Sequence, residues 1–182
     1  MRKISALLLL LLFIIISSCE KDDICSETTP TTPKLILRFF DIASQDDTKN
    51  VTSIGVTSRN LDNEEFIITG LNGVTTDSIA VPLRILPTDE NVTRFTFYKE
   101  FAVDDNGTPG DTTDDIYSGN PDVITFAYKR EDIYVSRACG FKTIFKELIL
   151  TVEQDGDNWI INSDILNATI ENETSAHVKI FH

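Results

Sequence analysis

Val92-Thr93-Arg94-Phe95-Thr96-Phe97-Tyr98-Lys99-Glu100-Phe101 is the stretch of sequence that decides the fold. Apolar and polar side chains alternate along it, and Phe95 and Phe97 recur at a period of two residues. This period is typical of a β-strand that turns one face toward a hydrophobic core. The stretch therefore predicts a half-buried strand.

The same alternation recurs on both sides of this stretch. Ser78 to Leu86 places Ile79, Val81, Leu83 and Ile85 on one face, while Pro82 on the other face predicts an edge strand or a break. Further strand-like segments are 35–42, 51–57, 65–69, 123–129, 133–136, 141–154, 159–161, 165–170 and 177–181. The segment 141–154 is ambiguous, because residues 145–148 are also compatible with a helical turn.

No long window beyond the first 18 residues carries the 3.6-residue apolar stripe of an amphipathic helix. Many short β-rich segments, separated by Gly, Asn, Asp and Pro, predict an all-β fold. We expect an antiparallel β-sandwich, with a small β-barrel as the alternative. Pro82 and a long Asp-rich loop favour the sandwich, whose edges are open.

The N-terminus has the organisation of a secretory signal. Arg2 and Lys3 precede a nearly continuous apolar run from Ile4 to Ile16, and small residues follow. The run is shorter than the roughly 20 residues that a membrane-spanning helix needs. Residues 1–18 are therefore expected to form a signal helix that is removed from the mature chain.

Ser17-Ser18-Cys19 at the end of the signal resembles the lipobox of bacterial lipoproteins. The resemblance implies cleavage before Cys19 and lipidation of its thiol. Each buried methylene contributes about 0.8 kcal/mol, so two or three acyl chains would anchor the protein stably. Glu20 to Asp23 resembles the Lys-Asp-Asp-type tag that directs Bacteroidetes lipoproteins to the cell surface, which implies a lipid-anchored, surface-exposed protein of the bacterial outer membrane.

Composition limits the remaining possibilities. The sequence is 41% hydrophobic and 25% charged, as expected of a globular domain. Loss of Arg2 and Lys3 with the signal takes the net charge from −13 to −15, which argues against nucleic-acid partners. We expect a lipidated tether with a Thr/Pro spacer over residues 19–33 and a single β-domain over residues 34–182.

The three cysteines are Cys19, Cys25 and Cys139. If Cys19 carries lipid, two thiols remain in an oxidising compartment, where such pairs usually form a disulfide. The alternative is two unrelated buried thiols. A Cys25–Cys139 bridge would close a loop of more than 100 residues and dock the Thr/Pro spacer along the sandwich, against an edge strand.

An acidic loop runs from Asp104 to Asp115 and contains Asn106-Gly107. Its oxygen-bearing side chains are of the kind that bind calcium, and it resembles the Asp-Asn-Gly calcium loops of extracellular bacterial proteins. The candidate ligands are Asp104, Asn106, Asp111, Asp114 and Asp115. The alternative is a solvated hairpin tip, because Pro109 replaces the glycine of an EF-hand and no Glu closes the loop.

No catalytic arrangement stands out. Arg137-Ala138-Cys139-Gly140 resembles a nucleophile site, which would need a histidine nearby. The two histidines, His177 and His182, both lie at the C-terminal end, and Cys139 is better explained by a disulfide with Cys25. Trp159 and the tyrosines could stack on sugar rings, although Trp159 beside two isoleucines is more typical of core packing. We therefore expect no enzyme and no cofactor other than a candidate calcium ion.

The mature sequence as a whole resembles an uncharacterised lipoprotein family of Bacteroidetes. The residues that carry the resemblance are Cys-Glu-Lys-Asp-Asp-Ile-Cys at 19–25, Thr-Pro-Thr-Thr-Pro at 29–33, Tyr-Val-Ser-Arg-Ala-Cys-Gly-Phe-Lys at 134–142, Asn158-Trp159-Ile160, and Asn172-Glu173 with His177-Val178. The resemblance implies a lipidated β-domain and supplies no activity.

These expectations describe an envelope lipoprotein that acts as a non-enzymatic binding or structural module. The alternative is a carbohydrate- or peptide-binding accessory lipoprotein of an outer-membrane uptake system. The membrane is expected as a partner through the lipid anchor, together with an envelope protein or a glycan. The oligomeric state is left open.

Overall fold

The computed structural model describes residues 24–26, 29, 31–59, 65–88 and 90–182. The expected signal helix and Cys19 lie outside the described residues. The strands are β1 (Leu35–Asp41), β2 (Ser44–Thr48), β3 (Val51–Arg59), β4 (Glu65–Ile67), β5 (Val74–Thr76), β6 (Ser78–Val81), β7 (Glu90–Asp104), β8 (Ile116–Ser136), β9 (Gly140–Val152), β10 (Asn162–Ile165) and β11 (Val178–Phe181).

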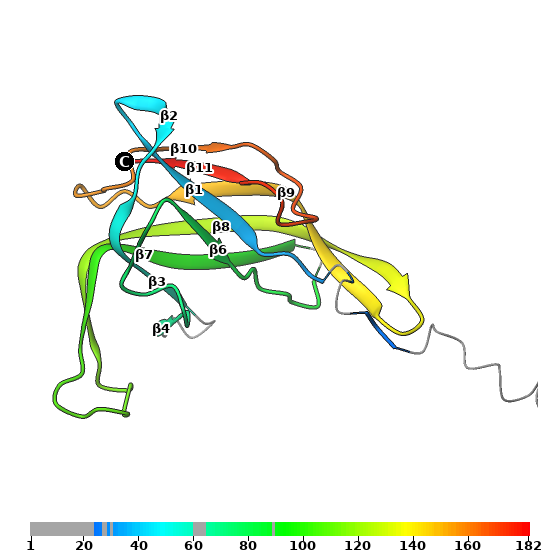
Figure 1. The fold of residues 1–182 in the computed structure, drawn as a ribbon, viewed down its shortest axis with the longest axis horizontal. Helices are drawn as coiled ribbons and strands as arrows, with labels where there is room; N and C mark the ends of the chain where they lie inside the picture. Colours follow the sequence, from blue (N-terminus) through cyan, green and yellow to red (C-terminus); the bar gives the residue numbers. More distant parts are fainter. Residues whose placement is uncertain (1–23, 27–28, 30, 60–64, 89) are drawn as a thin grey trace, which may run out of the picture.

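The strands form two sheets packed face to face (Figure 1). One sheet has the order β10-β11-β1-β2, and β6 also pairs with β1; the other has the order β4-β3-β7-β8-β9, and β5 also pairs with β3. The described residues contain no helix, and their sheets do not close into a barrel. The predicted β-sandwich is therefore confirmed over its small-barrel alternative.

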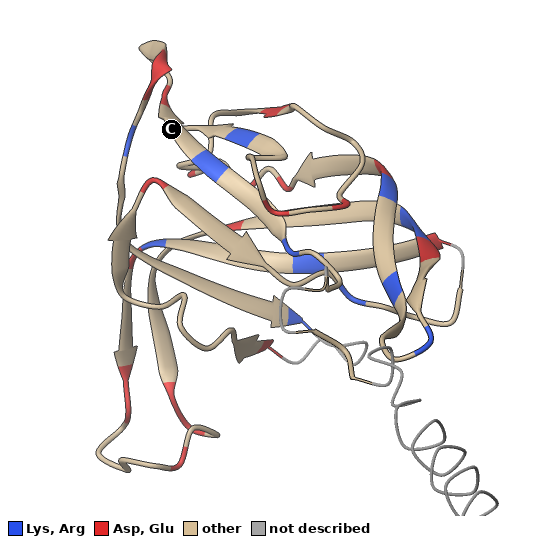
Figure 2. Cartoon of the chain, turned by 45° about the vertical axis from the view of Figure 1, so that its right-hand side comes forward, with Lys and Arg blue, Asp and Glu red and all other residues tan. Residues whose placement is uncertain are grey.

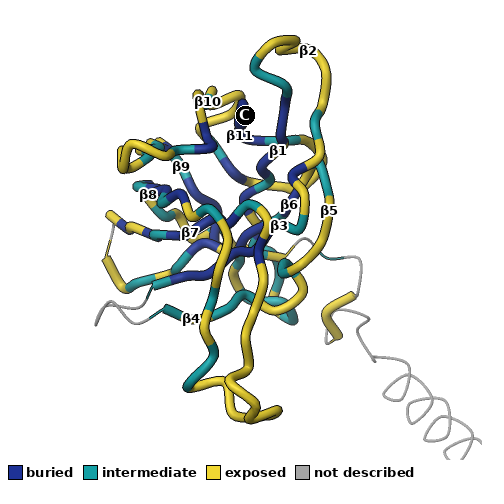
Figure 3. Tube along the Cα trace, turned by 90° about the vertical axis from the view of Figure 1, so that its left-hand side faces the viewer, coloured by how far each residue is buried: buried dark blue, intermediate teal, exposed yellow. Residues whose placement is uncertain are grey.

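The core lies between the two sheets, where the buried parts of the strands face one another (Figure 3). In the central parts of the inner strands, residues two apart point inward and are buried, including Leu35, Leu37 and Phe39 of β1, Phe95 and Phe97 of β7, and Ile124 and Phe126 of β8. Burial of one such side chain stabilises the fold by about 1.5–3 kcal/mol. The alternation in the sequence thus corresponds to the core face of each sheet.

β1 and β11 form a parallel ladder, with Leu37 opposite Val178 and Phe40 opposite Phe181. This pair departs from the expected purely antiparallel sandwich. A chain that enters the same sheet at both ends, with many strands between, can pair its two end strands in either direction. Local sequence therefore carries no signal for this ladder.

A β-bulge in β9 explains why the sequence there looked partly helical. Lys129 of β8 faces Lys146, whereas Ala127 faces Ile149, so β9 contains one extra residue between these pairs. Glu147 has a φ of +55° and occupies the bulge. Phe145 and Leu148 consequently both point into the core three residues apart, as they would on a helix. The strand predicted over 141–154 is confirmed, the helical alternative for residues 145–148 is wrong, and β9 is one continuous strand.

A second bulge changes the face to which side chains point at the end of β7. Lys99 faces Asn120 and Ala102 faces Ser118, and Glu100 has a φ of +58°. Phe101 therefore joins Tyr98 on the face opposite the core, with ring centroids 5.3 Å apart. The Phe101 ring fills the place of a side chain at Gly55, where a Cβ would lie 2.2 Å from it.

Other strand boundaries differ from the expectations. β6 ends at Val81, directly before Pro82, which confirms the predicted break. β8 is continuous where two strands were expected, and residues 159–161 are buried in part without being a strand. β2 and β5 were not predicted, because their sequences Ser-Gln-Asp-Asp-Thr and Val-Thr-Thr carry no period-two apolar pattern.

Candidate functional site

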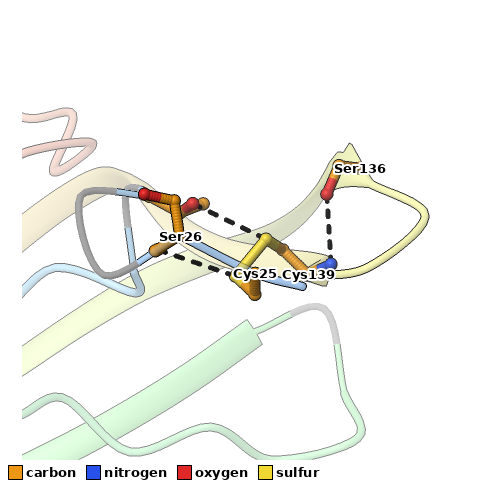
Figure 4. Close-up of a disulfide and its surroundings, with 5 residues drawn as sticks. Cys25, Ser26, Ser136 and Cys139 are labelled. Atoms are coloured by element: carbon orange, nitrogen blue, oxygen red, sulfur yellow. Dashed lines mark hydrogen bonds between the residues drawn. A yellow bond between two sulfur atoms is a disulfide. The ribbon is translucent and has the colours of Figure 1, made fainter. Parts of the chain in front are cut away.

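The segment before β1 is bonded to the tip of the β8–β9 hairpin. The sulfur atoms of Cys25 and Cys139 form a disulfide, with a Cα–Cα distance of 4.9 Å (Figure 4). Cys139 lies in the turn between the two strands, where its backbone N–H donates to Ser136 Oγ at 3.1 Å. The disulfide predicted from the cysteine count is therefore confirmed.

Hydrogen bonds also fasten the following spacer to the domain. Thr143 of β9 donates its backbone N–H to Thr32 Oγ1 at 3.0 Å, and the backbone N–H of Lys34 donates to Glu173 Oε1 at 2.8 Å. β9 is the outer strand of its sheet, so Thr32 covers a donor that the edge would otherwise expose. The spacer thus docks against an edge strand, as expected.

Cys19, the expected lipidation site, precedes Cys25 by six positions and lies outside the described residues. Six extended residues span at most about 20 Å. The disulfide therefore limits the distance between the hairpin tip and Cys19 to about 20 Å. Within the part of the chain that the structure describes, no helix is both long and apolar enough to cross a membrane.

The residues that a thiol enzyme would need have structural roles. Cys139 is bonded to Cys25, and His177 is 2% exposed. His177 Nδ1 accepts a hydrogen bond from the backbone N–H of Ile36 at 3.0 Å. The backbone N–H of His177 donates to the Ile36 carbonyl at 2.9 Å. Burial lowers the pKa of His177 below its usual value, although a hydrogen bond with the Asn172 backbone and the nearby Glu173 act in the opposite direction.

His182 likewise packs into the structure. Its ring lies 5.6 Å from the Trp159 ring in a T-shaped arrangement, and burial lowers its pKa. Trp159 is 6% exposed, and its Nε1–H donates to the Phe97 carbonyl at 3.2 Å. The tryptophan that was considered for sugar stacking is therefore part of the core.

Asp122 is a buried polar residue that the sequence analysis missed. It is fully buried; Oδ2 accepts from the backbone N–H of Ile160 at 2.6 Å, and Oδ1 accepts from Asn158 Nδ2 at 3.3 Å. Burial raises the pKa of its carboxyl, and the Ile160 hydrogen bond partly offsets this. Asp122 lies two residues before Ile124 and four before Phe126, so it is on the same inward face of β8. This position in the alternating pattern is the sequence signal that predicts its burial.

The acidic loop lies at the tip of the long β7–β8 hairpin and projects from the sandwich (Figure 2). Asp104 Oδ1 accepts from the backbone N–H of Asn106 at 3.0 Å, and Thr108 Oγ1 donates to Asp114 at 2.9 Å. Hydrogen bonds from the hydroxyl and the backbone N–H of Thr113 lower the pKa of Asp111. Hydrogen bonds among the polar groups of the loop therefore hold its residues together.

The predicted calcium ligands Asp104, Asn106, Asp111, Asp114 and Asp115 all belong to this loop. Asn106 Nδ2 lies 3.4 Å from Asp114 Oδ2, which brings two of them together. Among the described residues, which include the whole loop, no three His, Cys, Asp or Glu side chains form a group that could hold a metal ion. Calcium binding therefore stays a prediction, and the hydrogen bonds within the loop favour its alternative, the solvated hairpin tip.

Comparison with known proteins gives a family without a known activity. The model of a family of unknown function, DUF6452, matches residues 50–182. The match covers more than half of the chain, so the protein belongs to this family. No curated protein and no solved structure shows significant similarity to the chain.

His177 predicts a pH-dependent stability. Its folded pKa lies below the unfolded value of about 6.5, so the unfolded chain takes up a proton first as pH falls. Neutral, buried His177 therefore contributes to the free energy of unfolding. This contribution is fully present above pH about 6.5 and is lost as pH decreases through the folded pKa of His177. We expect urea unfolding of His177→Asn between pH about 8 and 5 to show a flatter pH dependence than wild type.

The control for this measurement is Ser175→Ala, because Ser175 is exposed on the same segment. Asn can offer Oδ1 to the Ile36 N–H, so the variant should fold with a stability loss of about 1–3 kcal/mol. An unchanged pH dependence in His177→Asn would contradict the assigned role.

The acidic loop predicts insensitivity to chelation. Because its carboxylates already accept hydrogen bonds within the loop, we expect the melting temperature to be the same in calcium and in excess chelator. A ligand that binds only the native state raises the melting temperature. A chelator-dependent drop that Asp114→Asn abolishes would therefore identify the loop as a calcium site.

Proposed function

We propose that this protein is a lipid-anchored lipoprotein of the bacterial outer membrane, exposed at the cell surface, whose β-sandwich is a non-enzymatic binding or structural module. Cys19 carries the lipid, and residues 19–24 connect it to the disulfide-bonded Cys25. The sandwich then stands directly on the membrane. Its partners are envelope proteins or glycans that meet it there.

The observation that carries the proposal is the bond between Cys25 and Cys139. A long spacer serves a protein that must reach far from its anchor. Here the spacer is instead fastened back onto the domain, by the disulfide and by the Thr32 and Glu173 hydrogen bonds. Such an attachment limits the distance between domain and membrane, which is useful in a module that works at the membrane surface.

The uses of the reactive side chains support a non-enzymatic role. Cys139 is oxidised in the disulfide, and His177 is hydrogen-bonded to the backbone of Ile36 in β1. Trp159 and Tyr128 are buried in the core. A closed apolar core with polar outer faces is what a structural or interaction module requires. The sandwich is therefore better suited to binding through its surface than through a catalytic pocket.

The second candidate function is the accessory role in uptake, with a peptide as the ligand. A cleft of about 380 Å³ favours it, lined mainly by apolar residues of β4, β7 and the segments that follow β4 and β6, with Ser58 of β3 at its wall. Phe66 is 48% exposed at this cleft, and Leu83 and Phe95 form part of its lining. Apolar lining suits an apolar peptide side chain better than a sugar.

Lipidation at Cys19 is the direct test of the first proposal. Cells that express the full chain are fed an alkyne fatty acid, and the purified protein is probed for the label. We expect wild type and Cys25→Ser to be labelled and Cys19→Ala to be unlabelled, because only Cys19 follows the Ser-Ser pair of the lipobox. Label retained in Cys19→Ala would contradict the proposal.

A further inference from the structure

The tip of the β8–β9 hairpin exposes two aromatic rings. Tyr134 and Phe141 face each other across the hairpin, one pair before the final Ser136–Gly140 pair, with centroids 5.4 Å apart in an edge-to-face arrangement. Tyr134 is 59% exposed and Phe141 is 68% exposed, compared with 48% for Phe66. Ile24, next to the disulfide on the tether, is 84% exposed.

The same tip is locally cationic in a strongly acidic protein. Arg137 is exposed in the turn, Lys142 Nζ donates to the Glu171 carbonyl at 3.2 Å, and no Asp or Glu occurs between Ile133 and Lys142. Farther along the hairpin, by contrast, Lys146 is paired with Glu131. Within the hairpin, residues 133–142 thus carry positive charge without an acidic residue among them, while the sequence that flanks Cys25 contains Glu20, Asp22, Asp23 and Glu27.

The opposite end of the molecule has the opposite charge. The β8–β9 tip and the acidic β7–β8 loop lie at the two ends of the long axis (Figure 1). All charged residues of the loop are acidic (Figure 2). The tether leaves the domain from the cationic end, through Cys25. A membrane that holds Cys19 would thus meet the aromatic, cationic end first.

We propose that the β8–β9 tip inserts into the headgroup region of the membrane to which Cys19 is anchored. Tyr134 and Phe141 enter the interface, and Arg137 and Lys142 contact anionic headgroups. Aromatic rings favour the membrane–water interface, and cations near an anionic membrane surface are attracted to it. The contact fixes the orientation of the sandwich, with the acidic loop directed away from the bilayer. The inference rests on the proposed lipid anchor.

The test uses the full lipidated protein, reconstituted into vesicles of phosphatidylcholine and phosphatidylglycerol. Phe141→Trp places a fluorophore at the tip, and Ile116→Trp places a matched one at an exposed position beside the acidic loop. The buried Trp159 is a constant background. In vesicles with acyl chains brominated near the headgroup, we expect loss of most of the added emission of Phe141→Trp and none of that of Ile116→Trp.

Vesicle sedimentation of the same samples separates the two proposals. Protein that sediments with vesicles while Phe141→Trp stays unquenched would overturn tip insertion and leave the anchor intact. Protein that fails to sediment would overturn both. A blue shift of Phe141→Trp without lipid quenching would assign the tip to contact with another copy of the chain. Equal quenching in pure phosphatidylcholine would overturn the role given to Arg137 and Lys142.

Discussion

The disulfide between Cys25 and Cys139 is the constraint on which the placement of this protein depends. It joins positions 114 residues apart, and in the chain-entropy model a loop of roughly 100 residues loses about 4.7 kcal/mol of unfolded-state entropy on closure. Its structural effect is more specific than its stabilising effect. It fixes the tether, at Cys25, to one end of a long hairpin, and thereby fixes which end of the sandwich would face the proposed lipid anchor.

The rest of the molecule supports that arrangement by packing alone. Two sheets bury their apolar faces against each other, and two polar side chains inside, Asp122 and His177, are hydrogen-bonded: Asp122 with Ile160 and Asn158, and His177 with Ile36. The edge of β9 is covered by Thr32 and by the Phe145–Ile170 bridge. The long hairpins extend from this rigid body, one toward the tether and one away from it, and they carry its exposed chemistry.

The fold class and most strands could be predicted because period-two burial is a local property of the sequence. Prediction failed where a bulge changed the period, as at Glu147, and where a strand such as β2 has no buried face. The parallel pairing of β1 with β11 depends on the whole chain path. The disulfide was predictable from cysteine count and compartment, whereas the roles of Asp122 and His177 emerge only when the strands that surround them are in place.

The measurement that tests the central claim most directly is cysteine mapping by mass spectrometry on protein purified from membranes and alkylated without reduction. The account predicts that the peptides containing Cys25 and Cys139 are linked and carry no alkyl label. After reduction, both should become alkylated, while Cys19 stays blocked by its lipid. Recovery of Cys25 and Cys139 as separate, alkylated thiols in the unreduced sample would contradict the account.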